Sequence, residues 1–389
     1  MTPDHVTHFI TVRIIYFTRD YTPHDRRFLS ALAETEHQVY YLRLERRGHA
    51  LEDRPLPAGI EAIQWEGGCR PARLSDGPRL LAGLRRVIRQ VRPDLIQAGP
   101  IQTCAFLTAL AGFHPLVSTS WGSDLLLDAD RDARYRWATR FTLLRSDALV
   151  GDCDTVRRKA IACGMRAERI VAFPWGVDLN HFRPERSIFP GEPPTTVPEA
   201  KTFTLLSTRG WEPVYGVDVI ARAFVQAADR LKELGGPELR LLMLGNGSQA
   251  GLLRGIFQRG GVLDQVFFPG QVSYADLPRY YHSANLYLSA SHSDGSSISL
   301  LEALACGRPA LVSDIPGNRE WIEPGVQGWW FPDGDAGALA EGILQSASVG
   351  EARLDEMGQA ARRLAEARAD WDQNFQLLLK AYDLAVRNG

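Results

Sequence analysis

Short runs rich in Val, Ile and Leu alternate with amphipathic helical stretches along the whole chain, and this alternation restricts the fold more than any other feature. RIIYFT at 13–18, PLVSTS at 115–120 and DALVGD at 147–152 are strand-like runs, whereas RLLAGLRRVIRQVRP at 79–93 places its apolar residues on one helical face. Parallel strands need crossover helices, which cover the sheet on both faces. The pattern therefore predicts α/β domains with parallel sheets.

The alternation stops at one place, near the middle of the chain. Residues 183–201, RPERSIFPGEPPTTVPEAK, contain five prolines and no apolar periodicity, which is typical of a linker. The alternation resumes with FTLLST at 203–208, and 389 residues exceed the usual size of one hydrophobic core. We therefore predict two doubly wound domains, residues 1–183 and 201–366, joined by a linker at 184–200, with ligands bound beyond the carboxyl ends of the strands.

Several classes of protein are disfavoured. The longest apolar runs are far shorter than the roughly 20 residues that span a bilayer, and the N-terminal sequence MTPDHVTHFITVRIIYF lacks the features of a signal peptide. No basic–aromatic module for nucleic acid is present. The cysteines are odd in number and form no CxxC pair, so neither zinc nor a disulfide framework is indicated: Cys69, Cys104, Cys153, Cys163 and Cys306. The sequence predicts a cytoplasmic protein.

The net charge of −2 conceals an asymmetry between the two halves. Residues 1–183 hold 26 Lys and Arg against 21 Asp and Glu, and the remaining residues hold 18 against 25. A basic first half can meet a phosphorylated acceptor or make weak peripheral contact with the inner face of a membrane. The alternative is that these arginines are ordinary solvated residues on helix faces.

The segment SDGSSISLLEALACGRPALVSD at 293–314 sets two carboxylates around a predicted helix N-terminus. The helix is expected to begin near Ser296 or Ser297, where small hydroxyl residues leave N–H groups free to meet phosphate oxygens. Asp294 on the loop and Glu302 in the helix can accept hydrogen bonds from sugar hydroxyls. This combination suits a nucleotide sugar. The alternative is that Asp294 caps the helix and Glu302 is a surface residue.

The block DGSSISLLEALACGRP at 294–309 resembles the signature of the retaining glycosyltransferases of family 4, whose paired acids are usually both Glu. Four further segments are similar to this family, over nearly the full length of the chain: PWGVDLNHFRP at 174–184, TRGWEPVYGVDVIARAF at 208–224, MLGNGS at 243–248 and GNREWIEPGVQGWWFPDGD at 317–335. The resemblance implies the GT-B fold, in which two Rossmann-like domains face a central cleft. The first domain would bind the acceptor and the second the nucleotide sugar.

The resemblance also implies a role for individual residues. Glu302 would bind the hydroxyls of the nucleotide ribose, and Asp294 would contact those of the transferred sugar. The amides of Ser297 and Ile298 would hold the diphosphate, and Arg209 would neutralise the leaving diphosphate without a metal or other cofactor. The other residues expected on the donor side are Tyr215, Gly245, Asn246, Val272, Gly295 and Ser296.

One departure from the family affects the donor side. Tyr215 stands where the family often has a Lys, just before the glycine that opens a helix. A tyrosine brings no charge at neutral pH, so Arg209 and the N–H groups around Ser297 must hold the leaving group between them.

Two further departures lie in the first domain. The family often carries a His followed by Gly after a strand, where this chain has Trp121 and Gly122. Trp121 would either stack on the sugar or belong to the core, and Asp124 is the nearest polar group; we count both as candidate catalytic residues. The loop YTPHDRR replaces the usual Gly-Gly loop, and its His24 and Asp25 would line the acceptor side. The alternative for His24 is an ordinary solvated side chain.

The C-terminal stretch ADWDQNFQLLLKAYDLAV at 369–386 predicts a helix with an apolar face. In the family that this chain resembles, such a helix crosses back to the first domain, so we expect residues 367–389 to do so.

Three functions are consistent with these residues. The first is a retaining hexosyltransferase, with uridine diphosphate sugars favoured by resemblance, acting on a hydroxyl of a glycan or small acceptor. The second is a nucleotide-sugar epimerase of the same fold, which needs acid and base groups near the ring carbons that the sequence does not clearly supply. The third is a degenerate, non-catalytic nucleotide-sugar-binding protein, suggested by the missing Lys and His.

Overall fold

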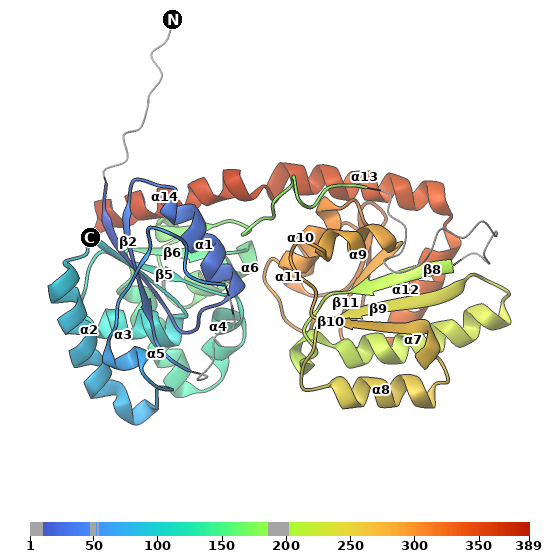
Figure 1. The fold of residues 1–389 in the computed structure, drawn as a ribbon, viewed down its shortest axis with the longest axis horizontal. Coiled ribbons are helices and arrows are strands. Elements are labelled where there is room, and N and C mark those ends of the chain that lie inside the picture. Colours follow the sequence, from blue (N-terminus) through green and yellow to red (C-terminus); the bar gives the residue numbers. More distant parts are fainter. Residues whose placement is uncertain (1–10, 47–51, 53, 186–201) are drawn as a thin grey trace, which may run out of the picture. The chain divides into compact units, whose positions relative to one another are not determined.

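The computed structural model describes residues 11–46, 52, 54–185 and 202–389. The chain forms two compact units (Figure 1): residues 1–173 together with 375–389, and residues 174–374. Each unit contains one parallel sheet.

The sheet of the first unit has seven strands in the order β3-β2-β1-β4-β5-β6-β7. The strands are β1 Arg13–Thr18, β2 Gln38–Arg43, β3 Glu61–Ala62, β4 Leu95–Ala98, β5 Leu116–Thr119, β6 Ala148–Gly151 and β7 Ile170–Ala172. The helices are α1 Pro23–Ala33, α2 Gly77–Val91, α3 Phe106–Ala111, α4 Ser123–Leu126, α5 Ala133–Leu144 and α6 Asp154–Ala162, with a π-helical turn η3 at Ile101–Ala105 before α3. The strand order reverses between β1 and β4.

The sheet of the second unit has six strands in the order β10-β9-β8-β11-β12-β13. The strands are β8 Thr202–Ser207, β9 Glu238–Leu244, β10 Val266–Gly270, β11 Leu286–Ser289, β12 Ala310–Ser313 and β13 Gly328–Phe331. The helices are α7 Val217–Glu233, α8 Ala250–Arg259, α9 Leu277–Ser283, α10 Ile298–Ala305, α11 Pro316–Arg319, α12 Ala336–Ser348 and α13 Glu351–Arg368, and a short 3-10 turn η6 at Pro213–Tyr215 precedes α7. Here the order reverses between β8 and β11.

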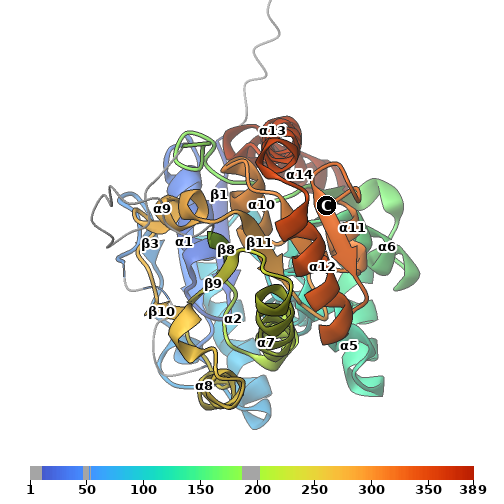
Figure 2. The same cartoon turned by 90° about the vertical axis from the view of Figure 1, so that its right-hand side faces the viewer.

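The strands of the second unit read as continuous apolar runs because helices cover both faces of the sheet. Leu205 and Leu241 point into the core shared with α7, α8 and α12, whereas their chain neighbours Leu206 and Leu242 point into the core shared with α9, α10 and α13. This alternation is the period of two that a strand imposes on its side chains. Figure 2 shows α7 and α8 on one side of the sheet and α9, α10 and α13 on the other. The predicted pair of doubly wound parallel-sheet domains is confirmed.

The boundary between the units differs from the expected one at residue 183. The first unit ends at Phe173, because the following segment packs on the second unit. The Val177 N–H donates to the Ala369 carbonyl at 2.7 Å, and Phe182 is buried in the second unit's core. Of the predicted linker at 184–200, residues 186–200 lie outside the described residues.

The last helix, α14 (Trp371–Asn388), begins in the second unit and continues in the first, to which residues 375–389 belong. Within the first unit Leu378 and Tyr382 are buried, and the Tyr382 hydroxyl donates to the Gln97 side chain on β4. No helix in the described part of the chain is long and apolar enough to cross a membrane.

Candidate functional site

The two strands at the reversal point of the second sheet each end in a loop that carries one of the predicted residues. Arg209 comes two residues after β8, and Asp294 follows β11, which pairs with β8 in parallel. The carboxyl ends of parallel strands meet at the same edge of a sheet, and a reversal of strand order opens a crevice there. The topology therefore brings together side chains that are 85 residues apart.

The Arg209 guanidinium joins these loops. One terminal nitrogen donates to the Ser297 hydroxyl at 2.7 Å and the Ser299 hydroxyl at 3.0 Å, and the other donates to an Asp294 carboxylate oxygen at 2.6 Å. Tyr287, from β11, donates its hydroxyl to Ser299 at 2.9 Å. A charged donor with charged and neutral acceptors at these distances makes strong hydrogen bonds, so the cluster is preorganised.

Tyr215 lies under this guanidinium. The Arg209 carbon Cζ is 4.1 Å from the centre of the Tyr215 ring, a cation–π contact. Burial acts to lower the pKa of Arg209, but Asp294 and the nearby tyrosines outweigh it, so the pKa is raised and the side chain stays charged. The buried Arg209 Nε has no hydrogen-bond partner among the described residues. Tyr215 therefore supports the cation instead of supplying a second charge.

Gly216, directly after Tyr215, explains how the loop closes on β11. Its φ is +57°, and a Cβ added there would lie 2.0 Å from the Ala290 carbonyl oxygen. Only glycine permits both this conformation and this approach.

Glu302, in the middle of α10, is 7% exposed and does not behave as a surface residue. The Tyr281 hydroxyl donates to a Glu302 carboxylate oxygen at 2.7 Å and lies 3.1 Å from the Thr208 hydroxyl. Burial and the Glu302 carboxylate raise the pKa of Tyr281 well above its ordinary range, so Tyr281 keeps its proton. Glu302 is thereby connected to the loop after β8 that also carries Arg209.

The N-terminus of α10 is built from three serines, two of which the sequence had singled out. Ser297 is the residue before the helix, with an extended backbone, and its hydroxyl accepts from Arg209 instead of capping the helix. The Ser296 hydroxyl accepts from the Trp321 indole at 3.2 Å. The first N–H groups of a helix have no carbonyl four residues earlier in the helix to bond. The N–H groups of Ile298 and Ser299 therefore lie at the N-terminal end of α10, where Arg209 bonds Ser297.

Of the remaining donor-side residues, three lie near the loops that carry Arg209 and Asp294, and the fourth packs against a hydrophobic core. Gly245 follows β9 with a φ of +100° beside the Arg209 backbone, and the Asn246 carbonyl accepts from the Trp211 N–H at 3.0 Å. Gly295 adjoins Asp294 and donates its N–H to that carboxylate at 3.1 Å. Val272, by contrast, follows β10 and packs against the core of α9 and α10.

In the first unit, Trp121 follows β5 and packs among aromatic side chains. Its ring centre is 6.2 Å from that of His24 and 6.1 Å from that of Phe28, both from α1. His24 is exposed and Trp121 is half-buried. The two predicted residues lie together, near the end of the sheet where loops follow the strands.

Asp25 and Asp124 have structural surroundings. Asp25 is 1% exposed; its carboxylate accepts from the Thr22 backbone and hydroxyl at the start of α1 and from the Tyr16 hydroxyl. The expectation that Asp25 lines the acceptor side therefore gains no support from its surroundings. Asp124 is also buried, and it accepts from the Ser120 hydroxyl and from three backbone N–H groups, including that of Trp121. Asp124 orients Trp121 in this structure, and its predicted catalytic role gains no support.

Asp25 is expected to make the stability of the protein depend on pH. Burial raises the pKa of its carboxyl from 3.8 to about 6, against the lowering effect of the Thr22 and Tyr16 hydrogen bonds. Because the folded-state pKa is above the unfolded one, its contribution is fully present below pH 3.8 and is lost as the pH rises through 6. We expect the free energy of unfolding of the wild type, measured with denaturant relative to that of Asp25→Asn, to fall by on the order of 3 kcal/mol between pH 3.5 and pH 7.5. A difference that is constant with pH would contradict this assignment.

Sequence reasoning missed Tyr281, Ser299 and Thr208. Ser299 is the third hydroxyl of the SSIS stretch, and its position in the first turn of the helix was a usable signal. Tyr281 lies in α9, far from every motif, and nothing in its local sequence distinguishes it from a core tyrosine.

Two family models and several curated proteins match the sequence of this chain. The family described as "Glycosyl transferases group 1" matches residues 196–364, and the family described as "Glycosyltransferase Family 4" matches residues 24–181. A UDP-N-acetylglucosamine--peptide N-acetylglucosaminyltransferase GtfA subunit from Streptococcus gordonii is 31% identical over 174 residues, 43% of this chain and 32% of that protein. The chain spans 25 to 55% of the length of the curated relatives it matches.

Two solved structures share the fold over almost the whole chain. HepE from Anabaena, in complex with UDP-glucose, has a TM-score of 0.73 at 19% identity and covers 96% of this chain and 99% of its own. Sucrose-phosphate synthase from Thermosynechococcus elongatus has a TM-score of 0.76 at 18% identity, covering 95% and 98%. At these identities the likeness shows a common fold.

Proposed function

Because the chain belongs to the glycosyltransferases of group 1 and has the GT-B fold, we propose that it is a retaining enzyme that transfers a hexose from a nucleotide sugar, with a UDP-sugar favoured, to a hydroxyl of a glycan or small acceptor. The observation that carries the proposal is the Arg209 guanidinium, which lies at the reversal point of the second sheet against the N-terminal serines of α10. A cation and helix N–H groups at this place suit a diphosphate.

The leaving group explains why such a cluster is needed. Departure of a nucleoside diphosphate develops negative charge, and fixed donors that are already oriented stabilise that charge without reorganisation. Arg209 and the amides of Ser297 and Ile298 take this part, so the reaction needs no metal or other cofactor in this proposal. Tyr215 keeps the guanidinium in place by its ring contact.

The two carboxylates take the sugars. Glu302 accepts hydrogen bonds from the ribose hydroxyls, since the Tyr281 hydroxyl orients its carboxylate and a carboxylate can accept several hydrogen bonds. Asp294 serves the hydroxyls of the transferred hexose, and its hydrogen bond to Arg209 ties the hexose site to the diphosphate site. In the first unit, His24 and Trp121 serve the acceptor side.

The function is tested by incubating the protein with a panel of nucleotide sugars and analysing the products. Release of nucleoside diphosphate with an unchanged anomeric configuration in the product supports retaining transfer. An altered sugar still bound to its nucleotide would support an epimerase, and binding without turnover would support a non-catalytic protein.

Tyr281→Phe is expected to weaken binding of the nucleoside diphosphate by roughly fivefold, about 1 kcal/mol. The reason is that Glu302 loses the hydroxyl that orients it, at the value of one ordinary hydrogen bond. Calorimetry with UDP measures the effect. Tyr280→Phe, one position earlier on α9, is the matched control, and equal affinities for the two variants would exclude a positioning role for Tyr281.

A further inference from the structure

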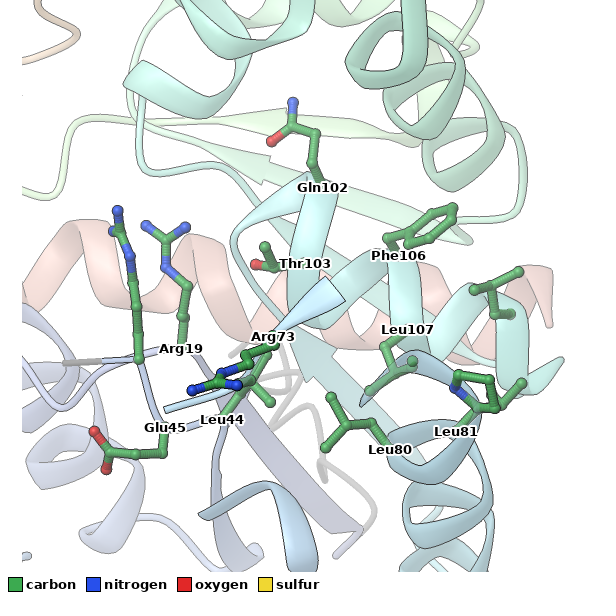
Figure 3. Close-up of a pocket in the computed structure, with 15 residues that line it drawn as sticks. Arg19, Leu44, Glu45, Arg73, Leu80, Leu81, Gln102, Thr103, Phe106 and Leu107 are labelled. Carbon is green, nitrogen blue, oxygen red and sulfur yellow. The ribbon is translucent and has the colours of Figure 1, made fainter. Parts of the chain in front are cut away.

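The first unit contains a cavity of about 620 Å³ that the proposed donor chemistry does not use. Its walls are apolar and come from α2, from α3 and from the end of β2 (Figure 3): Leu44, Leu80, Leu81, Phe106, Leu107 and Leu110. The volume is typical of small-molecule sites. Polar groups in the wall are already engaged, because the Gln102 amide donates to the Asp124 carbonyl at 2.7 Å and to the Thr139 hydroxyl at 2.9 Å. These walls suit a hydrocarbon chain and not a sugar.

Arginines stand at one side of this cavity. Figure 3 shows Arg19 and Arg73 on the side opposite Phe106 and Leu81. The Arg19 Nε forms an ion pair with Asp20 at 3.9 Å but makes no hydrogen bond within the described part of the chain. No described carboxylate forms an ion pair with the Arg73 side chain. The carboxylate that lines the cavity, Glu45, is paired with Arg43 at 2.8 Å. The cavity therefore combines apolar walls with a surplus of positive charge.

The cavity also lies at the place where a ligand of such a sheet is expected. Arg19 directly follows β1, and Gln102 and Thr103 belong to η3, which follows β4. The strand order of the first sheet reverses between these two strands, so the cavity opens at the reversal point.

An exposed aromatic strip on α5 continues from the cavity wall. Phe106 lines the cavity, and its ring centre is 5.7 Å from that of Trp137 and 5.6 Å from that of Phe141. Trp137 and Leu144 are each 57% exposed. Large apolar side chains that are exposed together often mark an interaction site. Four exposed arginines lie on the same helix or directly after it: Arg134, Arg136, Arg140 and Arg145. Apolar and basic residues together on one helix are typical of contact with an anionic lipid surface.

We propose that this cavity holds the hydrocarbon chain of a lipid acceptor in which a phosphate joins that chain to the hydroxyl-bearing group that receives the hexose. Arg19 and Arg73 bind this phosphate, and α5 rests on the anionic membrane surface from which the lipid comes. The inference rests on the proposed function, since it names the class of acceptor. It gives the basic first half of the chain a specific use, because the arginines bind the head group and the surface while Phe106 joins the strip to the cavity.

The cavity is tested by calorimetry with dodecyl phosphate below its micelle concentration, with butyl phosphate as the short-chain comparison. We expect butyl phosphate to bind at least tenfold more weakly. Leu81→Trp fills the cavity from a half-buried position and should weaken the binding of dodecyl phosphate at least tenfold. The double variant Arg19→Gln/Arg73→Gln should weaken it by as much. Arg89→Gln, on the exposed end of α2, should leave the affinity unchanged. Equal binding of the two phosphates, or unchanged affinity in folded Leu81→Trp, would overturn the proposal.

The source of the lipid is tested with vesicles of phosphatidylcholine alone and with added phosphatidylglycerol. We expect the protein to sediment with the anionic vesicles only. In the double variant Trp137→Ser/Leu144→Ser the fraction of protein that sediments should fall at least fivefold. This variant should bind monomeric dodecyl phosphate as the wild type does. Equal sedimentation of this variant would overturn the role of α5. UDP binding is measured on the same samples. Binding of dodecyl phosphate without binding of UDP would contradict the donor site and leave the cavity assignment unchanged. Binding of UDP without binding of dodecyl phosphate would contradict only the cavity assignment.

Discussion

Replacing Arg209 with alanine is expected to lower the turnover of sugar transfer at least a hundredfold. Loss of one preorganised donor to a developing anion has an effect of this order, and Arg209 is the cation that the structure sets against the first turn of α10. Because Tyr215 contributes no charge, no neighbouring side chain at this position replaces the lost one. Steady-state rates at saturating donor measure the effect on kcat, and thermal melting checks that the variant remains folded.

Two further variants separate charge from shape at this site. Tyr215→Phe keeps the ring under the guanidinium and should lower turnover only severalfold, because a neutral hydrogen bond contributes about 1 kcal/mol. Arg209→Lys keeps the charge but cannot reach Asp294, Ser297 and Ser299 together. Its turnover should therefore lie between that of the wild type and that of Arg209→Ala. A loss in Tyr215→Phe as deep as that in Arg209→Ala would mean that the wrong residue has been assigned to the phosphates.

Replacing Glu302 with alanine is expected to weaken binding of the nucleoside diphosphate by about 1.5–3 kcal/mol, roughly 10- to 150-fold in Kd. A carboxylate that accepts hydrogen bonds from two adjacent hydroxyls contributes more than a neutral acceptor, and burial of Glu302 beside Tyr281 limits competition from water. Calorimetric titration with UDP gives the affinity directly.

The controls for Glu302 use the same side-chain chemistry elsewhere. Glu233→Ala, at the exposed end of α7, should bind UDP with wild-type affinity, and Glu302→Gln should lose less than alanine because it keeps one oxygen acceptor. Titration with 2′-deoxyuridine diphosphate adds a second criterion, since the wild type should bind it more weakly while Glu302→Ala should hardly distinguish the two nucleotides. Wild-type affinity of a folded Glu302→Ala for every nucleoside diphosphate would refute the assignment.

The donor-side cluster was largely predictable because its residues lie in short segments with strong local signals. A carboxylate, a glycine and two serines before an apolar helix indicate where Asp294 and Ser297 lie relative to α10, and these relations depend on a few consecutive residues. The family resemblance assigned Asp294 and Arg209 to the same donor site, but the hydrogen bond between these side chains, which are 85 residues apart, was not predicted. Tyr281 was missed for the opposite reason: its partner Glu302 is 21 residues away, and only the packing of α9 on α10 brings them into contact.

The first unit shows where reasoning from the sequence fails. Asp25 was placed on the acceptor side because its segment stands where the resembled family has a Gly-Gly loop. In the structure Thr22 caps the start of α1 there, and the Asp25 carboxylate bonds to Thr22 and to the Tyr16 hydroxyl. The apolar cavity had no sequence signal, since leucines on α2 and α3 look the same whether they touch a neighbour or line a space.

The order of apolar and polar residues was enough to predict two parallel α/β domains, the helix at 298–305 and the kind of ligand that its N-terminus suits, because strand and helix periods and capping signals are local properties of the chain. Which side chains meet, and which are used up by internal hydrogen bonds, depended on strand order and on the packing of helices far apart in the sequence. Burial and partnership are properties of the space around a residue, so Asp25, Asp124 and Glu302, all carboxylates, acquire different surroundings that their local sequence does not encode.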